Sequence, residues 1–294
     1  MWLASWKARL VALISGCNLN ALPSAERKAE QATEQTTGSI LAHLSRDECA
    51  AEPSTSPFER KERTMPAVKN IVLVHGAWGD ASHWRHVIPP LHAKGYRIAA
   101  VQNPLTSLAD DVERTRKLAE SLEGPTLLVG HSYGGAVISG AGHASNVVGL
   151  VYVAAFAPDE GDSLGSIFAR RDPPSGAASI RPDKDGFLWL AQDTFRESFG
   201  QDLSETEALV MAVAQKPIAG RCFEDKAGAP AWKTKPSWYQ VSRHDHMIPP
   251  ETEQWMAERI KAKKIITLDA SHASLASHAK EIVALIDEAI AWLG

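Results

Sequence analysis

The chain has 294 residues, of which 44% are hydrophobic and 22% charged, and its formal net charge is −4. This length suits one large domain or two modest ones, and the composition is that of an ordinary globular protein. It excludes a collagen-like, wholly disordered or polytopic membrane protein. The slight acidity argues against a nucleic-acid partner, because nucleic-acid binding normally needs a basic surface. Three cysteines in so long a chain do not form a disulfide framework.

Residues 1–64 differ from the rest of the chain. They contain eight Lys/Arg and eight Asp/Glu, so residues 65–294 carry the whole net charge. From Ala21 to Thr64 apolar residues are sparse and follow no helical or strand period. Such a segment buries too little apolar surface to offset the entropy lost on ordering. We therefore predict a disordered leader or extension over 1–64 and one folded domain over 65–294.

Two interpretations stay open for the first residues. Lys7 and Arg9 precede the apolar run Leu10–Ile14, and Ser15-Gly16-Cys17 resembles the end of a bacterial lipoprotein signal. On that interpretation the protein is an envelope lipoprotein anchored through Cys17. On the other, which we favour because the apolar run is short, translation begins at Met65 and the protein is cytoplasmic. No segment reaches the ~18 apolar residues that a transmembrane helix needs.

From Asn70 onward, apolar runs alternate with helical patterns. Strands are predicted at Ile71–Val74, Tyr96–Val101, Thr126–Val129, Val147–Ala154, Ser237–Ser242 and Lys264–Leu268. Continuous apolar runs are typical of strands buried on both faces of a parallel sheet. The pattern predicts an α/β fold with a mostly parallel six-stranded sheet flanked by helices. Ligands of such sheets bind beyond the carboxyl ends of the strands.

Residues 158–236 interrupt this alternation and are too long for a loop. Helical patterns over Phe187–Phe199 and Ser204–Gln215 predict a helical cap insert. Aromatic residues of this insert either line the roof of a pocket or pack its own small core, and we favour the core for most of them: Phe187, Phe195, Phe199 and Trp232. Trp189 is the candidate for contact with a substrate.

The sequence Gly130-His131-Ser132-Tyr133-Gly134 is a G-x-S-x-G motif between a predicted strand and a predicted helix. A sharp strand-to-helix turn of this kind exposes the serine oxygen, and small neighbours allow the backbones to approach. The motif lacks the spacing of dinucleotide-binding and P-loop sequences. Ser132 is therefore the predicted nucleophile.

A serine nucleophile needs a base and a group that orients the base. Asp245 follows the strand Ser237–Ser242, and His272 follows the last strand, in the order Ser, acid, His. We predict that Asp245 is the acid and His272 the base. An acid at Asp159 or Asp162 is the main alternative.

The negatively charged oxygen of an acyl-transfer intermediate needs two backbone donors. Tyr133 N–H, directly after the nucleophile, is one candidate, and the loop after the first strand supplies the other. In that loop we choose Ala77 N–H, with Trp78 as the next choice. Gly76 allows the backbone to approach a substrate closely, so Gly76 and Trp78 are candidates for substrate contact.

Metal binding is a weak interpretation of this sequence. His244 and His246 flank Asp245, but their spacing comes without a further Cys or His partner. Asp269, three residues before His272, is interpreted as a cap or a surface charge. We predict neither a metal nor an organic cofactor.

Four segments together resemble the α/β-hydrolase superfamily: His75-Gly76-Ala77-Trp78, the Gly-rich turn around Ser132, Asp245 before Ile248-Pro249-Pro250, and Ser271-His272-Ala273. They are most similar to the branch of small esterases related to plant methylesterases and hydroxynitrile lyases. The resemblance covers about Asn70 to Leu293. It implies cleavage of a small carboxylic ester through an acyl-serine intermediate, without metal or cofactor.

Two positions depart from the lyases of this branch. Those lyases have a lysine directly after the catalytic histidine and a threonine after the early histidine, where this chain has Ala273 and Gly76. We therefore expect hydrolysis. A non-catalytic ligand-binding protein of the same fold, and a cofactor-free perhydrolase or lyase, are the alternatives. The sequence leaves open whether the protein is a monomer or a homodimer.

Overall fold

The structure is a computed structural model that describes residues 67–294. The expectations for residues 1–64, including lipidation at Cys17, lie outside the described residues. Within 67–294 no helix combines the length and the apolar character needed to cross a bilayer.

Six strands form the central sheet, in the order β2-β1-β3-β4-β8-β9, and each is parallel to its neighbours. The strands are β1 (Asn70–Val74), β2 (Arg97–Ala100), β3 (Thr126–His131), β4 (Val147–Val153), β8 (Ser237–Ser242) and β9 (Ile265–Leu268). The predicted six-stranded parallel sheet is confirmed. Because all carboxyl ends lie at one edge, the residues that follow β1, β3, β8 and β9 gather there.

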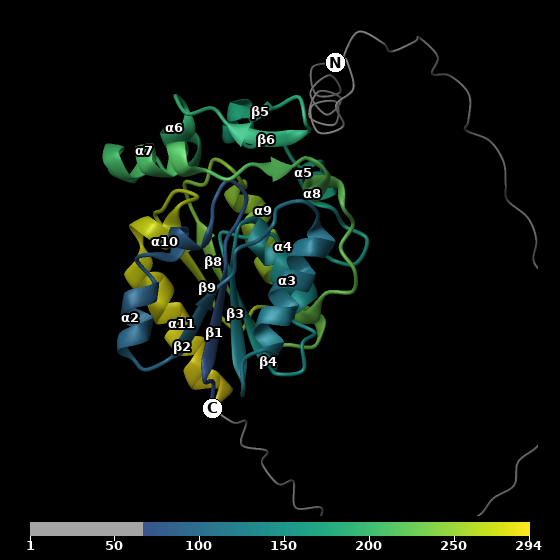
Figure 1. The fold of residues 1–294 in the computed structure, drawn as a ribbon, viewed down its shortest axis with the longest axis vertical. Coiled ribbons are helices and arrows are strands. Elements are labelled where there is room, and N and C mark those ends of the chain that lie inside the picture. Colours follow the sequence, from purple (N-terminus) through teal and green to yellow (C-terminus); the bar gives the residue numbers. More distant parts are fainter. Residues whose placement is uncertain (1–66) are drawn as a thin grey trace, which may run out of the picture. The chain divides into compact units, whose positions relative to one another are not determined.

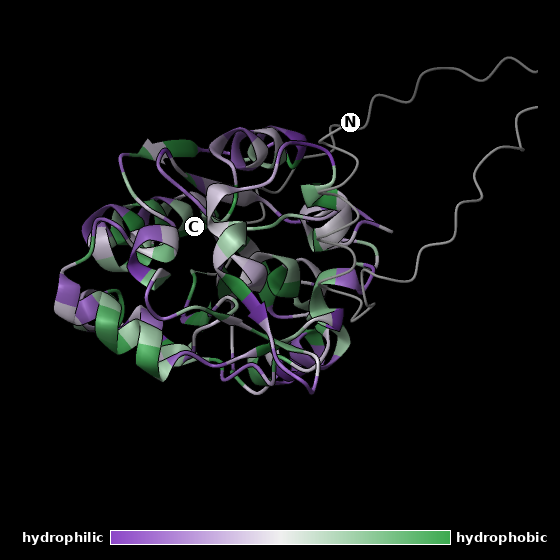
Figure 2. Cartoon of the chain, turned by 90° about the horizontal axis from the view of Figure 1, so that it is seen from above, coloured by the Kyte–Doolittle hydropathy of each residue, from purple (hydrophilic) through white to green (hydrophobic). Residues whose placement is uncertain are grey.

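Helices cover both faces of this sheet (Figure 1). One face is covered by α2 (Ile88–Ala93) and α11 (Ala279–Leu293), with the short η1 (Ala81–Trp84) and α10 (Ser274–Ser277). The other face is covered by α3 (Leu108–Glu120), α4 (Tyr133–Ala141) and α9 (Pro250–Arg259). Helical ribbons in Figure 2 combine hydrophobic and hydrophilic residues, as expected where one side of a helix faces the core.

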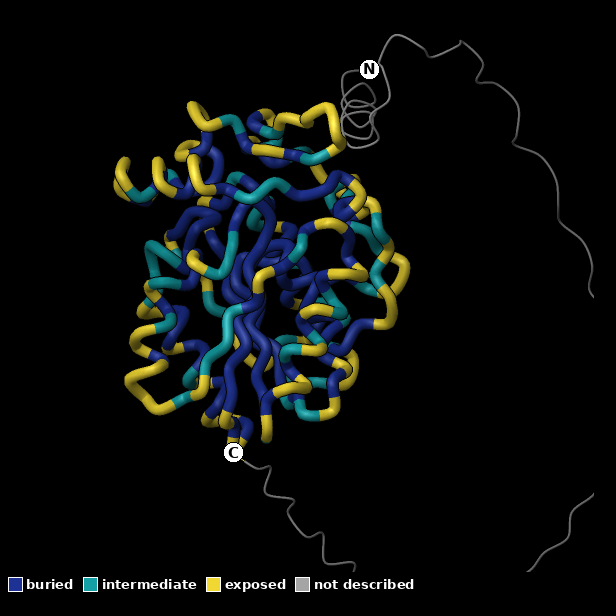
Figure 3. The backbone as a smooth tube through the Cα atoms, viewed as in Figure 1, coloured by how far each residue is buried: buried dark blue, intermediate teal, exposed yellow. Residues whose placement is uncertain are grey.

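Two apolar cores sandwich the sheet. In β1, Ile71 and Leu73 belong to the core under α2 and α11, whereas Val72 and Val74 belong to the core under α3 and α4. Every residue of β1, β3 and β8 is buried, as the tube coloured by burial shows (Figure 3). The unbroken apolar runs of these strands follow from burial on both faces.

The cap insert between β4 and β8 is mixed rather than helical. Residues Phe187–Leu190 form the strand β6, which pairs antiparallel with β5 (Ile180–Pro182) and β7 (Ile218–Ala219). The helix predicted over Phe187–Phe199 is therefore wrong in its first half. The remaining cap elements are η2 (Ser175–Ser179), η3 (Ala231–Lys233), α5 (Leu164–Phe168), α6 (Phe195–Phe199), α7 (Glu205–Ala214) and α8 (Arg221–Glu224).

Candidate active site

Ser132 lies in the sharp turn between β3 and α4. Its backbone has φ 53° and ψ −124°, a conformation that residues with a side chain rarely adopt. Space at this turn requires the glycines: a Cβ on Gly130 would lie 2.6 Å from the carbonyl oxygen of Gly134. A Cβ on Gly134 would lie 2.4 Å from the carbonyl oxygen of Val74. The G-x-S-x-G sequence thus allows the strained turn that presents the serine at the carboxyl edge of the sheet.

Asp245 lies in the loop that follows β8. Its Oδ1 accepts hydrogen bonds from the backbone amides of Met247 at 2.6 Å and Ile248 at 2.8 Å. The side chain thus closes a turn of its own loop, and only 5% of the residue is exposed. This arrangement fixes the carboxylate and leaves Oδ2 free for another donor.

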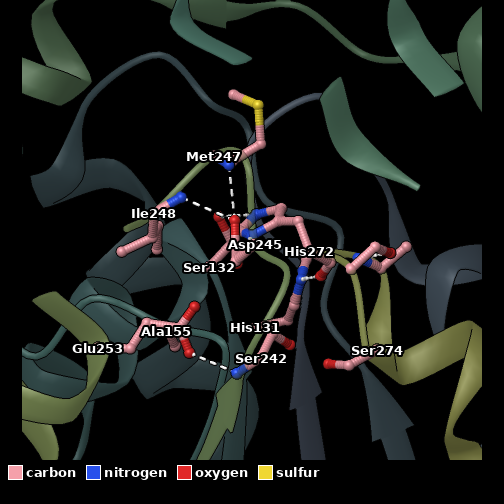
Figure 4. Close-up of polar contacts among 12 residues, drawn as sticks. His131, Ser132, Ala155, Ser242, Asp245, Met247, Ile248, Glu253, His272 and Ser274 are labelled. Atoms are coloured by element: carbon pink, nitrogen blue, oxygen red, sulfur yellow. Dashed lines mark hydrogen bonds and ion pairs between the residues drawn. The ribbon is translucent and has the colours of Figure 1, made fainter. Parts of the chain in front are cut away.

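His272 connects Asp245 to Ser132 (Figure 4). Its Nδ1 lies 2.5 Å from Asp245 Oδ2, and its Nε2 lies 2.8 Å from Ser132 Oγ. Because a carboxylate accepts, Nδ1 carries the hydrogen and Nε2 can accept from the serine hydroxyl. The structure therefore brings together the three side chains that the sequence selected, in a continuous chain of hydrogen bonds.

The residue before Ser132 holds the main chain of His272. His131 Nε2 lies 2.8 Å from the carbonyl oxygen of His272 and donates to it, and the two rings lie 4.8 Å apart. Burial lowers the pKa of His131 well below its usual value, so this imidazole is neutral. The motif therefore fixes His272 twice, through its side chain and through its backbone.

The loop after β1 lies against the same turn. His75 Nδ1 donates to the carbonyl oxygen of Gly76 at 2.8 Å, and His75 Nε2 accepts from the amide of Asn103 at 3.0 Å. Burial lowers the pKa of His75 to about 4, which keeps this ring neutral. In a planar trans peptide the N–H points opposite to the C=O, so the Ala77 N–H points away from the His75 ring.

Two backbone amides at this place have no hydrogen-bond partner among the described residues, 67–294. Tyr133 is the first residue of α4, and its amide donates to no backbone carbonyl of residues 67–294, as is common at a helix N-terminus. Among residues 67–294, the Ala77 amide donates no hydrogen bond to another backbone group. Gly76 approaches Ser132 itself, since a Cβ on Gly76 would lie 2.6 Å from Ser132 Cβ. Gly76 thus keeps this loop tight against the serine.

A cavity opens at Ser132 and extends beneath the cap. Its walls are Ala77, Trp78, Ser132, Tyr133, Phe156, Leu164, Phe168, Pro174, Ala177, Ile180, Leu188, Phe223, Met247 and Ile248. None of these side chains is charged. Trp78, one of the predicted contact residues, is held in this wall by a hydrogen bond from Nε1 to the carbonyl oxygen of Leu188 at 3.0 Å.

Trp189 does not line this cavity, which corrects its predicted place in the roof. The side chain is 37% exposed, and its Nε1 donates to Asp183 Oδ2 at 3.0 Å. Neighbouring residues of a strand point to opposite faces, so in β6 Leu188 faces the cavity and Trp189 faces outward.

Ion pairs with basic residues account for the alternative acids. Asp159 pairs with Lys233 at 2.5 Å, and Asp162 pairs with Arg259 at 2.8 Å. Asp269 lies 2.5 Å from the guanidinium of Arg243. Of the acids weighed in the sequence, Asp245 is the one that contacts His272.

The two histidines beside Asp245 make separate contacts. His246 Nδ1 donates to the carbonyl oxygen of Glu197 at 2.8 Å, and His244 Nε2 lies 3.6 Å from Asp269 Oδ1. In the part of the chain that the structure describes, no three His, Cys, Asp or Glu side chains gather as metal ligands would.

Sequence reasoning missed a buried carboxyl group beneath the loop that carries Asp245. Glu253 on α9 is fully buried, and its Oε2 accepts from the amide of Ser242 at 3.0 Å (Figure 4). Burial, and then the negative charge of Asp245, raise the pKa of Glu253 well above its usual value. The raised pKa favours the neutral form of Glu253. In the sequence, the signal that could have found this residue is an acidic side chain on the side of a helix that faces the core.

Comparisons with known proteins find similarity to one family and to several enzymes. A sequence model of the alpha/beta hydrolase family matches residues 71–285. A carbendazim hydrolyzing esterase of Nocardioides is 33% identical over 125 residues, which are 38% of this chain and 52% of that esterase. The match therefore spans about half the length of that relative.

Two further relatives match over most of their length. A pyrethroid hydrolase of Sphingobium wenxiniae is 27% identical, covering 70% of this chain and 82% of that protein. Methylesterase 8 of Arabidopsis thaliana is 24% identical, covering 69% and 82%. A crystal structure of a pyrethroid hydrolase from Sphingobium faniae has a TM-score of 0.65 at 22% identity, covering 76% of this chain and 97% of that one. That structure supports the fold.

Proposed function

Because the chain belongs to the alpha/beta hydrolase family, we propose that it is a serine esterase that cleaves a small neutral carboxylic ester through an acyl-serine intermediate. The coarser class, carboxylic ester hydrolase, rests on relatives that are named as esterases and hydrolases. The finer proposal rests on one observation, the hydrogen-bonded chain from Ser132 Oγ through the His272 ring to Asp245 Oδ2.

In the first half of the reaction His272 acts as base. Its Nε2 takes the proton of Ser132 Oγ while that oxygen attacks the ester carbonyl. Asp245 keeps the ring in the required tautomer and stabilises the imidazolium that forms. The amides of Ala77 and Tyr133 are assigned to the negatively charged carbonyl oxygen. His272 then gives its proton to the departing alcohol, and Ser132 carries the acyl group.

In the second half water takes the place of the alcohol. His272 removes a proton from water, which attacks the acyl carbonyl, and collapse of the intermediate releases the acid and returns the proton to Ser132. Both halves use the same side chains, so the proposal needs no cofactor.

The walls of the cavity support a neutral, apolar substrate. A charged group inside would lose its hydration without gaining a counterion from the lining residues. Aromatic and aliphatic side chains offer apolar contact to either half of a small ester. We therefore assign esters of uncharged acyl and alcohol groups to this site.

The test compares the full chain with its S132A variant on p-nitrophenyl acetate and with a fluorophosphonate probe. We expect repeated turnover and labelling for the wild type, and loss of both for S132A. The control variant is S121A, at the end of α3, where the hydroxyl only donates to the Leu118 carbonyl. A single equivalent of product from the wild type would instead indicate a binding protein, and labelling that persists in S132A would refute the nucleophile.

A further inference from the structure

The cap contains a segment that does not face the cavity. Residues Phe195–Asp202, here called the cap segment, comprise α6 and the three residues after it. This segment contacts the loop after β8 and the loop after β9, which carry Asp245 and His272. Its contacts are polar and directional, so they fix positions rather than only fill space.

Asp202 binds the residue directly before His272. Its Oδ1 accepts from the hydroxyl of Ser271 at 2.5 Å, and its Oδ2 accepts from the amide of Ser271 at 3.0 Å. Ser271 Oγ in turn accepts from the amide of Ala273 at 3.1 Å. Hydrogen bonds to an ionised carboxylate are stronger than neutral ones. The backbone on both sides of His272 is thus tied to one carboxylate from the cap.

The loop that carries Asp245 is bound by the same segment. Gln201 Nε2 donates to the carbonyl oxygen of His244 at 2.6 Å, and the carbonyl oxygen of Glu197 accepts from His246 at 2.8 Å. The residues on either side of Asp245 therefore both contact the cap segment.

The ring of His272 also packs against this segment. Phe199 is fully buried, and its ring lies 4.8 Å from the His272 ring at an interplanar angle of 83°. An edge-to-face contact of this kind restricts rotation of the imidazole.

On these contacts, and resting on the proposed function, we propose that the cap segment positions the acid and the base of the reaction, and that Asp202 is the positioning residue for His272. Asp202 contacts neither the cavity walls nor the Ser132 oxygen, so it acts through Ser271. A catalytic histidine displaced by a fraction of an ångström transfers its proton poorly, which lowers the rate of the chemical step more than substrate binding.

The test measures kcat and KM for D202A, with p-nitrophenyl acetate as substrate. We expect kcat to fall by about 10- to 100-fold while KM stays within about threefold. The rate of labelling by the fluorophosphonate probe should fall in parallel. D202N can still exchange two hydrogen bonds with Ser271, so it should recover most of the activity. The matched control is D193A, which removes another exposed acid of the cap near the start of α6.

A double-mutant cycle with S271A separates positioning from general destabilisation. Since D202A already removes the hydrogen bond that S271A removes, the one from the Ser271 hydroxyl, the double variant should be little slower than D202A alone. Thermal melting before the assay identifies any variant that fails to fold. If D202A fails to fold, the kinetic comparison uses S271A as the single variant in its place. An unchanged kcat in D202A, or fully additive losses, would overturn the inference. Turnover by S132A would instead refute the proposed function itself, so the two failures are distinguishable.

Discussion

The close approach of Gly76 to Ser132 predicts a large loss of activity in the G76A variant. A Cβ at position 76 would lie 2.6 Å from Ser132 Cβ, 3.0 Å from the carbonyl oxygen of His131 and 3.2 Å from Ser132 Oγ. The backbone of Gly76 is not in the left-handed region, so alanine meets no conformational penalty there. The whole effect of the substitution is therefore steric, and it acts where the loop meets the nucleophile.

The magnitude follows from the required displacement. Ordinary contacts of a Cβ begin at 3.4 Å, so the loop must move away from Ser132 by about 1 Å. A misplacement of that size can cost about 100-fold in rate, and loss of one oxyanion donor costs about 3–4 kcal/mol. We expect kcat of G76A to fall by about 100- to 1,000-fold with a smaller change in KM.

The assay is steady-state hydrolysis of p-nitrophenyl acetate, with melting temperature recorded for each variant. G228A is the matched control, because a Cβ on Gly228 would meet no atom within 4 Å. It should keep wild-type activity within about twofold. If G76A were as active as G228A, the assignment of the Gly76–Ala77 loop to the oxyanion would be refuted.

Two further predictions concern the cap and the carboxyl of Glu253. W189A should keep kcat/KM within about twofold of the wild type, because Trp189 faces outward. L188F, one residue away and in the cavity wall, should shift the preference among p-nitrophenyl esters toward shorter acyl chains. The reverse pattern would contradict the assignment of the two faces of β6. The pKa of Glu253 is raised in the folded state. Above the ordinary value of 4.5, the unfolded chain therefore binds fewer protons than the folded chain. The free energy of unfolding then falls as pH rises, by up to about 1.4 kcal/mol per pH unit. E253Q removes this contribution, so urea unfolding should show E253Q gaining stability relative to wild type from pH 5 to pH 8, and a difference independent of pH would count against a neutral Glu253.

Much of the fold was predictable because its determinants are local. Each central strand is an apolar run closed by a turn, so the parallel sheet and the α/β-hydrolase resemblance, both confirmed, followed from periodicity and motifs. Ser132, Asp245 and His272 could be selected for a related reason. Each follows a strand, and parallel strands bring such positions to one edge. Their catalytic roles stay predictions that the variants above test.

The rest depended on contacts between distant segments. Phe187–Leu190 is a short apolar run that fits a helix or a strand, and its pairing with Ile180–Pro182 and Ile218–Ala219 decides for a strand. The bond from Asp202 to Ser271 joins residues 69 positions apart, which no local pattern encodes. A single sequence therefore does not reveal which residues from a distant part of the chain support a site.

The uncharged walls of the cavity have a consequence for the end of each reaction cycle. A neutral ester enters, but at neutral pH its cleavage yields a carboxylate anion, and no lining side chain offers that anion a cation. Water solvates the anion far better than aliphatic and aromatic walls do. The apolar surface that binds the neutral ester therefore binds the carboxylate product weakly. Weak binding favours rapid product release and opposes synthesis of the ester from the acid and the alcohol.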